Sequence, residues 1–100
     1  MKGYLVFTRD KTLDKDEMAT YSKEVPATFA GHEFKILALY SAYEDLEGAA
    51  TEGTVLLEFP STEAAKAWYN SPEYRKVREH RFKGANYRGH AHRGSVRLWR

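Results

Sequence analysis

The segment Glu58–Tyr74 constrains the fold more than any other part of the chain, because it combines the end of a strand with two helix starts. The apolar run before Pro60 predicts a strand, and Pro60 ends it since proline cannot donate a ladder hydrogen bond. Ser61 is suited to cap one helix, and Ser71 followed by Pro72 repeats the start signal for another. This order predicts a strand followed by a helical element that is broken in two.

Further elements are predicted from the spacing of apolar residues along the rest of the chain. Asp14 and Glu17 resemble a capping box, and Pro26 lies inside the helix that they begin, so its last turns should be kinked or restarted. The predicted strands cover residues 3–8, 33–40, 54–59 and 87–92, the first helix covers 15–29, a turn covers 9–12, and a surface connection or hairpin arm covers 41–53. The order β-α-β-β-α-β predicts an α+β, ferredoxin-like fold, an antiparallel sheet with its helices on one face.

Several predicted strands carry apolar residues on both faces. In the first strand, Tyr4 and Val6 lie on one face and Leu5 and Phe7 on the other. An isolated sheet of this kind should be polar on its open face. We therefore expect a second copy of the chain to cover that face, which gives a symmetric homodimer packed sheet against sheet. The 100 residues suffice for a single domain. We expect it to span residues 1–96, with 97–100 as a C-terminal tail or an added edge strand.

The composition indicates a folded, soluble and cytoplasmic protein. No segment approaches the roughly 18 consecutive apolar residues of a membrane span, so we expect no membrane partner. The N-terminal run is too short and too weakly flanked for a secretory signal. Because the chain has no cysteine, disulfides, thiol nucleophiles and thiolate metal sites are excluded.

The charges are unevenly distributed along the chain. Residues 1–74 carry seven Lys and Arg against thirteen Asp and Glu, whereas residues 75–100 carry nine against one. This asymmetry either attracts an anionic partner or is neutralised within the fold or across a dimer. An RNA-recognition sheet would need exposed aromatic residues on its third strand, but that strand lacks them and contains Glu58. We therefore expect no nucleic-acid partner.

The chain also resembles a known family to about Val96. The matching residues are Leu46-Glu47-Gly48, Glu58-Phe59-Pro60-Ser61, Ala64-Ala65, Trp68-Tyr69, Ser71-Pro72-Glu73-Tyr74, His80-Arg81, Gly84-Ala85, Tyr87-Arg88-Gly89 and Gly94. This pattern is similar to that of the domain-of-unknown-function 1330 (DUF1330) family, part of the dimeric α/β-barrel superfamily. The resemblance implies a cleft between sheet and helices, where superfamily members act as cofactor-free monooxygenases, cyclases, isomerases or dehalogenases, bind haem, or sense ligands. It departs in the second strand, where many members have an Arg-Gly-Gly run and this chain has Ala38-Leu39-Tyr40.

Arg81 is the first candidate site residue. On the last predicted helix it shares an inward stripe with Tyr74 and Ala85. A buried guanidinium stays charged and therefore needs a carboxylate, carbonyl groups or an anionic ligand. Arg81 thus either binds an anionic ligand or forms an internal salt bridge, for example with Glu58. His80 beside it is either a general base or an ordinary exposed histidine.

Aromatic residues gather around the broken helix and form a second candidate group. These are Trp68, Tyr69, Tyr74 and Tyr87, with Tyr4 approaching from the first strand. Such rings either line a pocket for a planar ligand or belong to the plain core. His90 and His92 share one face of a strand and could bind a metal together, but no third ligand has a suitable spacing, so we expect no metal site.

These observations predict a protein that binds a small anionic or aromatic metabolite in the cleft without a cofactor. The predicted catalytic residues are His80 and Arg81, and the predicted ligand-binding residues are Tyr4, Trp68, Tyr69, Tyr74, Arg81 and Tyr87. The sequence leaves open whether this is a cofactor-free enzyme of the cyclase, isomerase or monooxygenase type. The alternative is a non-catalytic homodimer with a ligand-binding or structural role.

Overall fold

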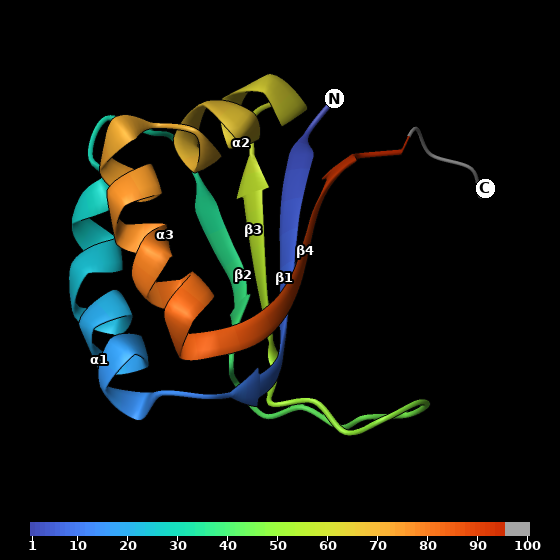
Figure 1. The fold of residues 1–100 in the computed structure, drawn as a ribbon. Coiled ribbons are helices and arrows are strands. Elements are labelled where there is room, and N and C mark those ends of the chain that lie inside the picture. Colours follow the sequence, from blue (N-terminus) through green and yellow to red (C-terminus); the bar gives the residue numbers. More distant parts are fainter. Residues whose placement is uncertain (96–100) are drawn as a thin grey trace.

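A four-stranded antiparallel sheet carries the helices on one face (Figure 1). The computed structural model of the chain describes residues 1–95, so the expected tail at 97–100 lies outside the described residues. In chain order the elements are β1 (Gly3–Thr12), α1 (Lys15–Glu24), the 3-10 helix η1 (Val25–Phe29), β2 (Lys35–Leu39), β3 (Thr54–Phe59), α2 (Thr62–Tyr69), α3 (Pro72–Gly84) and β4 (Ala85–Arg93). The strands lie in the order β2-β3-β1-β4.

The prediction of a turn at residues 9–12 is wrong, because β1 continues past a bulge to Thr12 and pairs with β4. The length of β1 is set by a partner strand that is distant in the sequence. Strand β4 follows α3 without a loop, and its first residue, Ala85, supplies the partner of Thr12. The backbone N–H of Leu13 also donates to the Gly84 carbonyl at 2.7 Å, which fixes the end of β1 to the end of α3.

Asp14 caps the start of α1, because its carboxylate accepts hydrogen bonds from the backbone N–H groups of Asp16 and Glu17 at 3.0 and 3.2 Å. Regular α-helical geometry ends at Glu24, and the chain continues as η1 with Pro26 in its first turn. Proline has no N–H for the α-helical ladder. The expected irregular end of this helix is therefore confirmed.

Both predicted helix starts after β3 are confirmed. The hydroxyl of Ser61 accepts a hydrogen bond from the backbone N–H of Ala64 at 3.0 Å, and that of Ser71 accepts one from Tyr74 at 3.3 Å. Because the chain turns at Asn70, α2 packs against β1 while α3 lies beside α1. None of the helices within residues 1–95 has the length and apolarity needed to cross a membrane.

The core lies between the helices and the sheet. Its buried side chains are Leu5, Phe7, Leu57, Phe59, Ala65, Trp68 and Tyr74. Burying a large apolar side chain of this kind contributes about 1.5–3 kcal/mol. Helix α1 packs mainly against α3 rather than against the sheet, so side chains fill the space between α1 and the strands only in part.

The other face of the sheet is not covered by any helix of residues 1–95 (Figure 1). Tyr4 and Val6 lie in register with Glu58 and Leu56 there, and all four are half-buried. The connection at residues 41–53 extends away from the helices as an arm. Of the two predicted alternatives, a plain surface connection or a hairpin arm, the structure has the arm. Both the arm and the end of β4 project past this open face.

Candidate ligand-binding site

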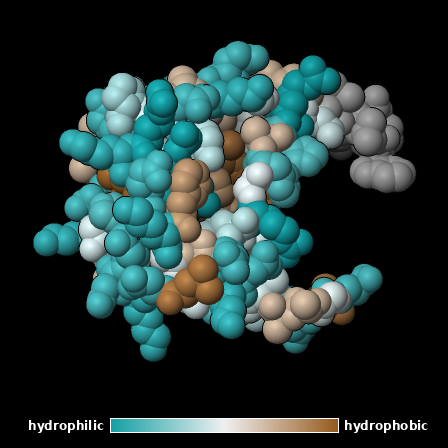
Figure 2. Space-filling model, in the orientation of Figure 1, coloured by the Kyte–Doolittle hydropathy of each residue, from teal (hydrophilic) through white to brown (hydrophobic). Residues whose placement is uncertain are grey.

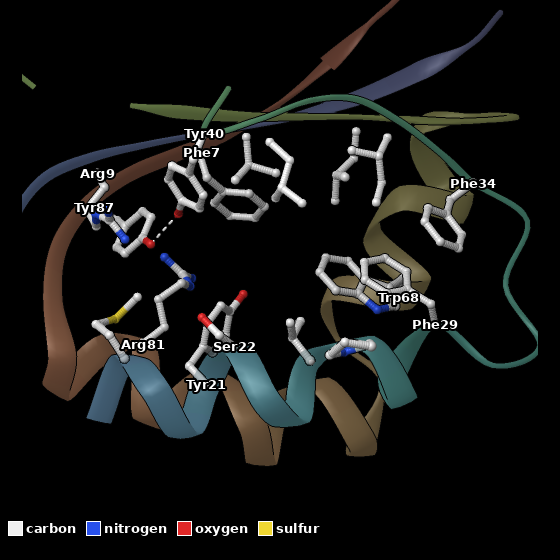
Figure 3. Close-up of a pocket in the computed structure, with 17 residues that line it drawn as sticks. Phe7, Arg9, Tyr21, Ser22, Phe29, Phe34, Tyr40, Trp68, Arg81 and Tyr87 are labelled. Carbon is white, nitrogen blue, oxygen red and sulfur yellow. Dashed lines mark hydrogen bonds between the residues drawn. The ribbon is translucent and has the colours of Figure 1, made fainter. Parts of the chain in front are cut away.

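A cavity of about 340 Å³ lies between the sheet and the helices α1 and η1 (Figure 3). A bulge in β2 lets both Ile36 and Leu39 line it, although they are three residues apart. The full lining is Phe7, Arg9, Met18, Tyr21, Ser22, Val25, Pro26, Phe29, Phe34, Ile36, Leu39, Tyr40, Val55, Leu57, Trp68, Arg81 and Tyr87. The size is within the range of small-molecule sites, about 300–1,000 Å³.

One end of the cavity is a stack of aromatic rings (Figure 3). Phe29 lies between Phe34 and Trp68, with ring centres 4.2 and 4.5 Å apart and nearly parallel planes. The indole of Trp68 donates a hydrogen bond to the hydroxyl of Thr28 at 3.1 Å, which fixes its orientation. This end therefore offers flat, rigid apolar surfaces.

The opposite end holds Arg81, which is only 5% exposed. Its guanidinium carbon lies 4.9 Å from the ring centres of both Phe7 and Tyr87. Within residues 1–95 the guanidinium forms no salt bridge, and its Nε has no hydrogen-bond partner. The inward position predicted for Arg81 is confirmed, and it is a buried cation without a carboxylate in the described part of the chain.

The alternative of an ion pair between Arg81 and Glu58 is wrong. Glu58 alternates with the core residues Leu57 and Phe59, so it lies on the open face of the sheet, where it accepts a hydrogen bond from the Tyr4 hydroxyl at 3.2 Å. Tyr4 is consequently also outside the cavity, although it was predicted to bind the ligand.

The polar end combines a cation with uncharged phenols. Burial lowers the pKa of Arg81, but the phenols of Tyr74 and Tyr21 raise it by more, so it lies above its ordinary value. Burial also raises the pKa of Tyr21 and of Tyr40. Around neutral pH the cavity therefore presents a charged guanidinium beside hydroxyl groups that keep their protons.

Tyr40 and Arg9 also line this end of the cavity, although neither was predicted as a site residue from the sequence. The Tyr40 hydroxyl hydrogen-bonds that of Tyr87, and Arg9 lies 4.5 Å from the Tyr40 ring centre while it pairs with Glu52 at 2.9 Å. Tyr40 has a φ of 48°, in the left-handed region that favours glycine. The available signal was the departure at Ala38-Leu39-Tyr40 from the Arg-Gly-Gly run that the family resemblance led us to expect.

The remaining predicted site residues do not line this cavity. His80 lies between α1 and α3, where its Nδ1 is 2.6 Å from Glu17 and its Nε2 is 3.7 Å from Glu24. Tyr74 is fully buried and shares a 2.8 Å hydrogen bond with the hydroxyl of Tyr21. Of the predicted residues, the structure brings Trp68, Arg81 and Tyr87 together around the cavity and leaves out Tyr4, Tyr69, Tyr74 and His80.

The family resemblance is confirmed by comparison with known proteins. A family model described as a domain of unknown function (DUF1330) matches residues 2–94. The chain belongs to the DUF1330 family. No curated protein sequence matches it.

Solved structures similar to this DUF1330 chain share its fold at low sequence identity. A protein of unknown function from Rhodopseudomonas palustris is 16% identical, with a TM-score of 0.71 over 96% of this chain and 84% of that one. A dimeric ferredoxin-like protein of unknown function from Thermobifida fusca is 10% identical, with a TM-score of 0.64 over 93% and 91%. SnoaB, a cofactor-independent oxygenase from Streptomyces nogalater, is 9% identical, with a TM-score of 0.59 over 97% and 96%. The ferredoxin-like fold is thereby confirmed.

His90 and His92 of this DUF1330 chain lie side by side on β4, with ring centres 5.4 Å apart. Residues 1–95 contain no group of three or more His, Asp or Glu side chains arranged to hold a metal ion. The pair alone gives a metal too few protein ligands for a structural site.

Alkaline titration should reveal the buried phenols. The pKa of Tyr21 and Tyr40 is raised in the folded protein, so these groups stabilise the fold below the ordinary tyrosine pKa of about 10, and this stabilisation is lost as the pH rises above it. Their tyrosinate absorbance should therefore appear together with the loss of helical circular dichroism. Tyr40→Phe should reduce the amplitude of this late phase. Complete tyrosine ionisation while the helical signal is intact would contradict the assignment.

Proposed function

We propose that this protein binds a small, flat metabolite with one negative charge in the cavity between sheet and helices. The observation that carries the proposal is Arg81, a cation that is 5% exposed, faces an apolar cavity and has no salt bridge within residues 1–95. A charge is costly to bury unless it is paired. A ligand carboxylate, phenolate or enolate would supply the missing partner.

The two ends of the cavity define the ligand class. The rings of Phe29, Phe34 and Trp68 suit an aromatic or conjugated body, while Arg81 suits its anionic group. The second cation of the lining, Arg9, is already neutralised by its 2.9 Å ion pair with Glu52. One uncompensated positive charge therefore remains, which favours a monoanion.

The lining favours binding over general base catalysis. None of the described lining residues is Asp, Glu or His, and His80 is held between two helices by Glu17 and Glu24. Arg81 and the phenols can stabilise an anion, but they do not remove a proton at neutral pH. A cofactor-free reaction, the second candidate, would therefore need a substrate that ionises by itself.

Titration with a matched pair of aromatic compounds tests the proposal. We suggest 2-naphthoate and the isosteric, uncharged 2-naphthamide, with the fluorescence of Trp68 as the signal in a Trp99→Phe background. Because a hydrogen bond to a charged group is worth about 1.5–3 kcal/mol, 2-naphthoate should bind at least about tenfold more tightly. Equal affinity of the two compounds, or no quenching by either, would overturn the proposed anion site.

We also propose that the open face of the sheet is covered by a second copy of the chain. Support comes from the half-buried Val6 and Leu56 on this face, and from the similar structure from Thermobifida fusca, which is described as dimeric. Sedimentation equilibrium should give twice the chain mass. Val6→Glu should shift the equilibrium to monomers, whereas Ala19→Glu on the exposed side of α1 should not. A monomeric parent protein would refute this arrangement.

A further inference from the structure

A second cavity, of about 450 Å³, lies on the other side of Arg81 from the first. Residues of β1, α2, α3 and β4 line it. It opens onto the face between α2, α3 and β4, which is hollowed in Figure 2. Its polar lining residues include Lys66, Asn70, Arg81 and His90, and Tyr69 and Phe82 supply aromatic walls.

Arg81 belongs to the partition between the two cavities. Phe7, Arg81 and Tyr87 line both of them. Gly89 of β4 packs closely against this partition, because a Cβ atom there would lie 2.8 Å from the Phe7 ring. On the outer side Phe82, itself 49% exposed, lies over the guanidinium, with its ring centre 5.0 Å away. Because Arg81 lines both cavities, its charge acts on an anion in either of them.

The two cavities differ in charge. Arg9 in the first is paired with Glu52, but within residues 1–95 neither Lys66 nor Arg81 of the second forms a salt bridge. None of the described residues that line the second cavity is Asp or Glu. Two uncompensated cations in one recess attract an oxyanion, and a neighbouring amide such as Asn70 can add a hydrogen bond.

We propose that the second cavity is a subsite for a small oxyanion of the phosphate type, held by Lys66, Asn70 and Arg81. The anion is either free or one group of a larger metabolite. The proposal shares Arg81 with the proposed function but does not require a ligand in the first cavity. Two anions on opposite sides of one guanidinium compete for its charge, so phosphate should weaken the binding of 2-naphthoate and not that of 2-naphthamide.

Calorimetric titration of the full chain with inorganic phosphate, at ionic strength fixed with sodium chloride, tests this subsite. Lys66 is exposed, so Lys66→Gln should leave the fold intact and weaken phosphate binding by about two- to fivefold. Lys76→Gln, an equally exposed change on α3 outside both cavities, is the matched control and should have no effect. Phosphate binding that is absent, or unchanged by Lys66→Gln, would overturn the subsite.

A variant that fills the first cavity separates this proposal from the proposed function. Ile36 lines only the first cavity and is 49% exposed, so Ile36→Trp should block 2-naphthoate without changing phosphate binding. Loss of phosphate binding in Ile36→Trp would contradict a separate subsite. A comparison of phenyl phosphate with inorganic phosphate identifies the source of the anion. If phenyl phosphate binds more tightly, the anion is one group of a larger metabolite, whereas equal affinity indicates a free anion.

Discussion

Arg81→Met should weaken the binding of 2-naphthoate by about 10- to 100-fold and leave the binding of 2-naphthamide within about twofold. Methionine fills a similar volume but removes the charge that faces the cavity. The guanidinium is 5% exposed and has no salt bridge within residues 1–95, so its contribution to the fold comes from the neighbouring rings of Phe7, Phe82 and Tyr87. The free energy of unfolding should therefore fall by less than about 2 kcal/mol.

Measuring both ligand affinity and the free energy of unfolding of Arg81→Met distinguishes a ligand-binding arginine from a structural one. If Arg81 served mainly to hold Phe7, Tyr87 and the neighbouring phenols in place, Arg81→Met would lower the free energy of unfolding by about 2 kcal/mol or more. The matched control is Arg78→Met on the same helix. Arg78 stacks on Tyr69 and donates to its carbonyl at 3.0 Å, but it lines neither cavity, so this change should preserve 2-naphthoate binding.

Trp68→Ala should lower the free energy of unfolding by about 3–5 kcal/mol. Trp68 is 1% exposed, stacks on Phe29 with ring centres 4.5 Å apart and donates a hydrogen bond to Thr28. Its removal leaves a cavity between α2, η1 and the sheet, and the Thr28 hydroxyl loses the indole donor while it still donates to the Val25 carbonyl. For a domain whose total stability is typically about 5–15 kcal/mol, this is a large fraction.

Urea denaturation followed by far-ultraviolet circular dichroism measures this loss. Trp68→Phe keeps an aromatic ring against Phe29 and should cost markedly less than Trp68→Ala. Tyr43→Ala, an exposed aromatic change on the arm, controls for the size of the deletion and should cost less than about 1 kcal/mol. A loss below about 1 kcal/mol for Trp68→Ala would show that the aromatic end is not part of the stabilising core.

Local signals in the sequence predicted most of the fold. The serines before α2 and α3 cap those helices as expected, and Pro26 ends the regular part of α1. The extension of β1 to Thr12 was not predictable from its polar residues, because its partner strand β4 begins directly after a helix far along the chain. Capping is decided by neighbours in sequence, whereas strand length is decided by a distant partner.

The site was predicted only in part. The helical stripe correctly placed Arg81 inward. The suggested pairing with Glu58 is wrong, because the strand parity opposite to Leu57 and Phe59 puts that carboxylate on the open face rather than on the side of Arg81. His80 was chosen for its chemistry, and its contact with α1 is a tertiary property that residue type does not reveal. Tyr40 enters the site through an unusual backbone conformation, which sequence periodicity does not detect.

The central claim is that the guanidinium of Arg81 binds the anionic group of a ligand in the first cavity. Nuclear magnetic resonance of protein with isotope-labelled arginine tests it most directly, because the Arg81 Nε has no hydrogen-bond partner within residues 1–95. The signal of this N–H is identified by its absence from Arg81→Lys. It should move on addition of 2-naphthoate and stay in place with 2-naphthamide. An Arg81 signal that ignores saturating 2-naphthoate, or responds equally to both compounds, would contradict the claim.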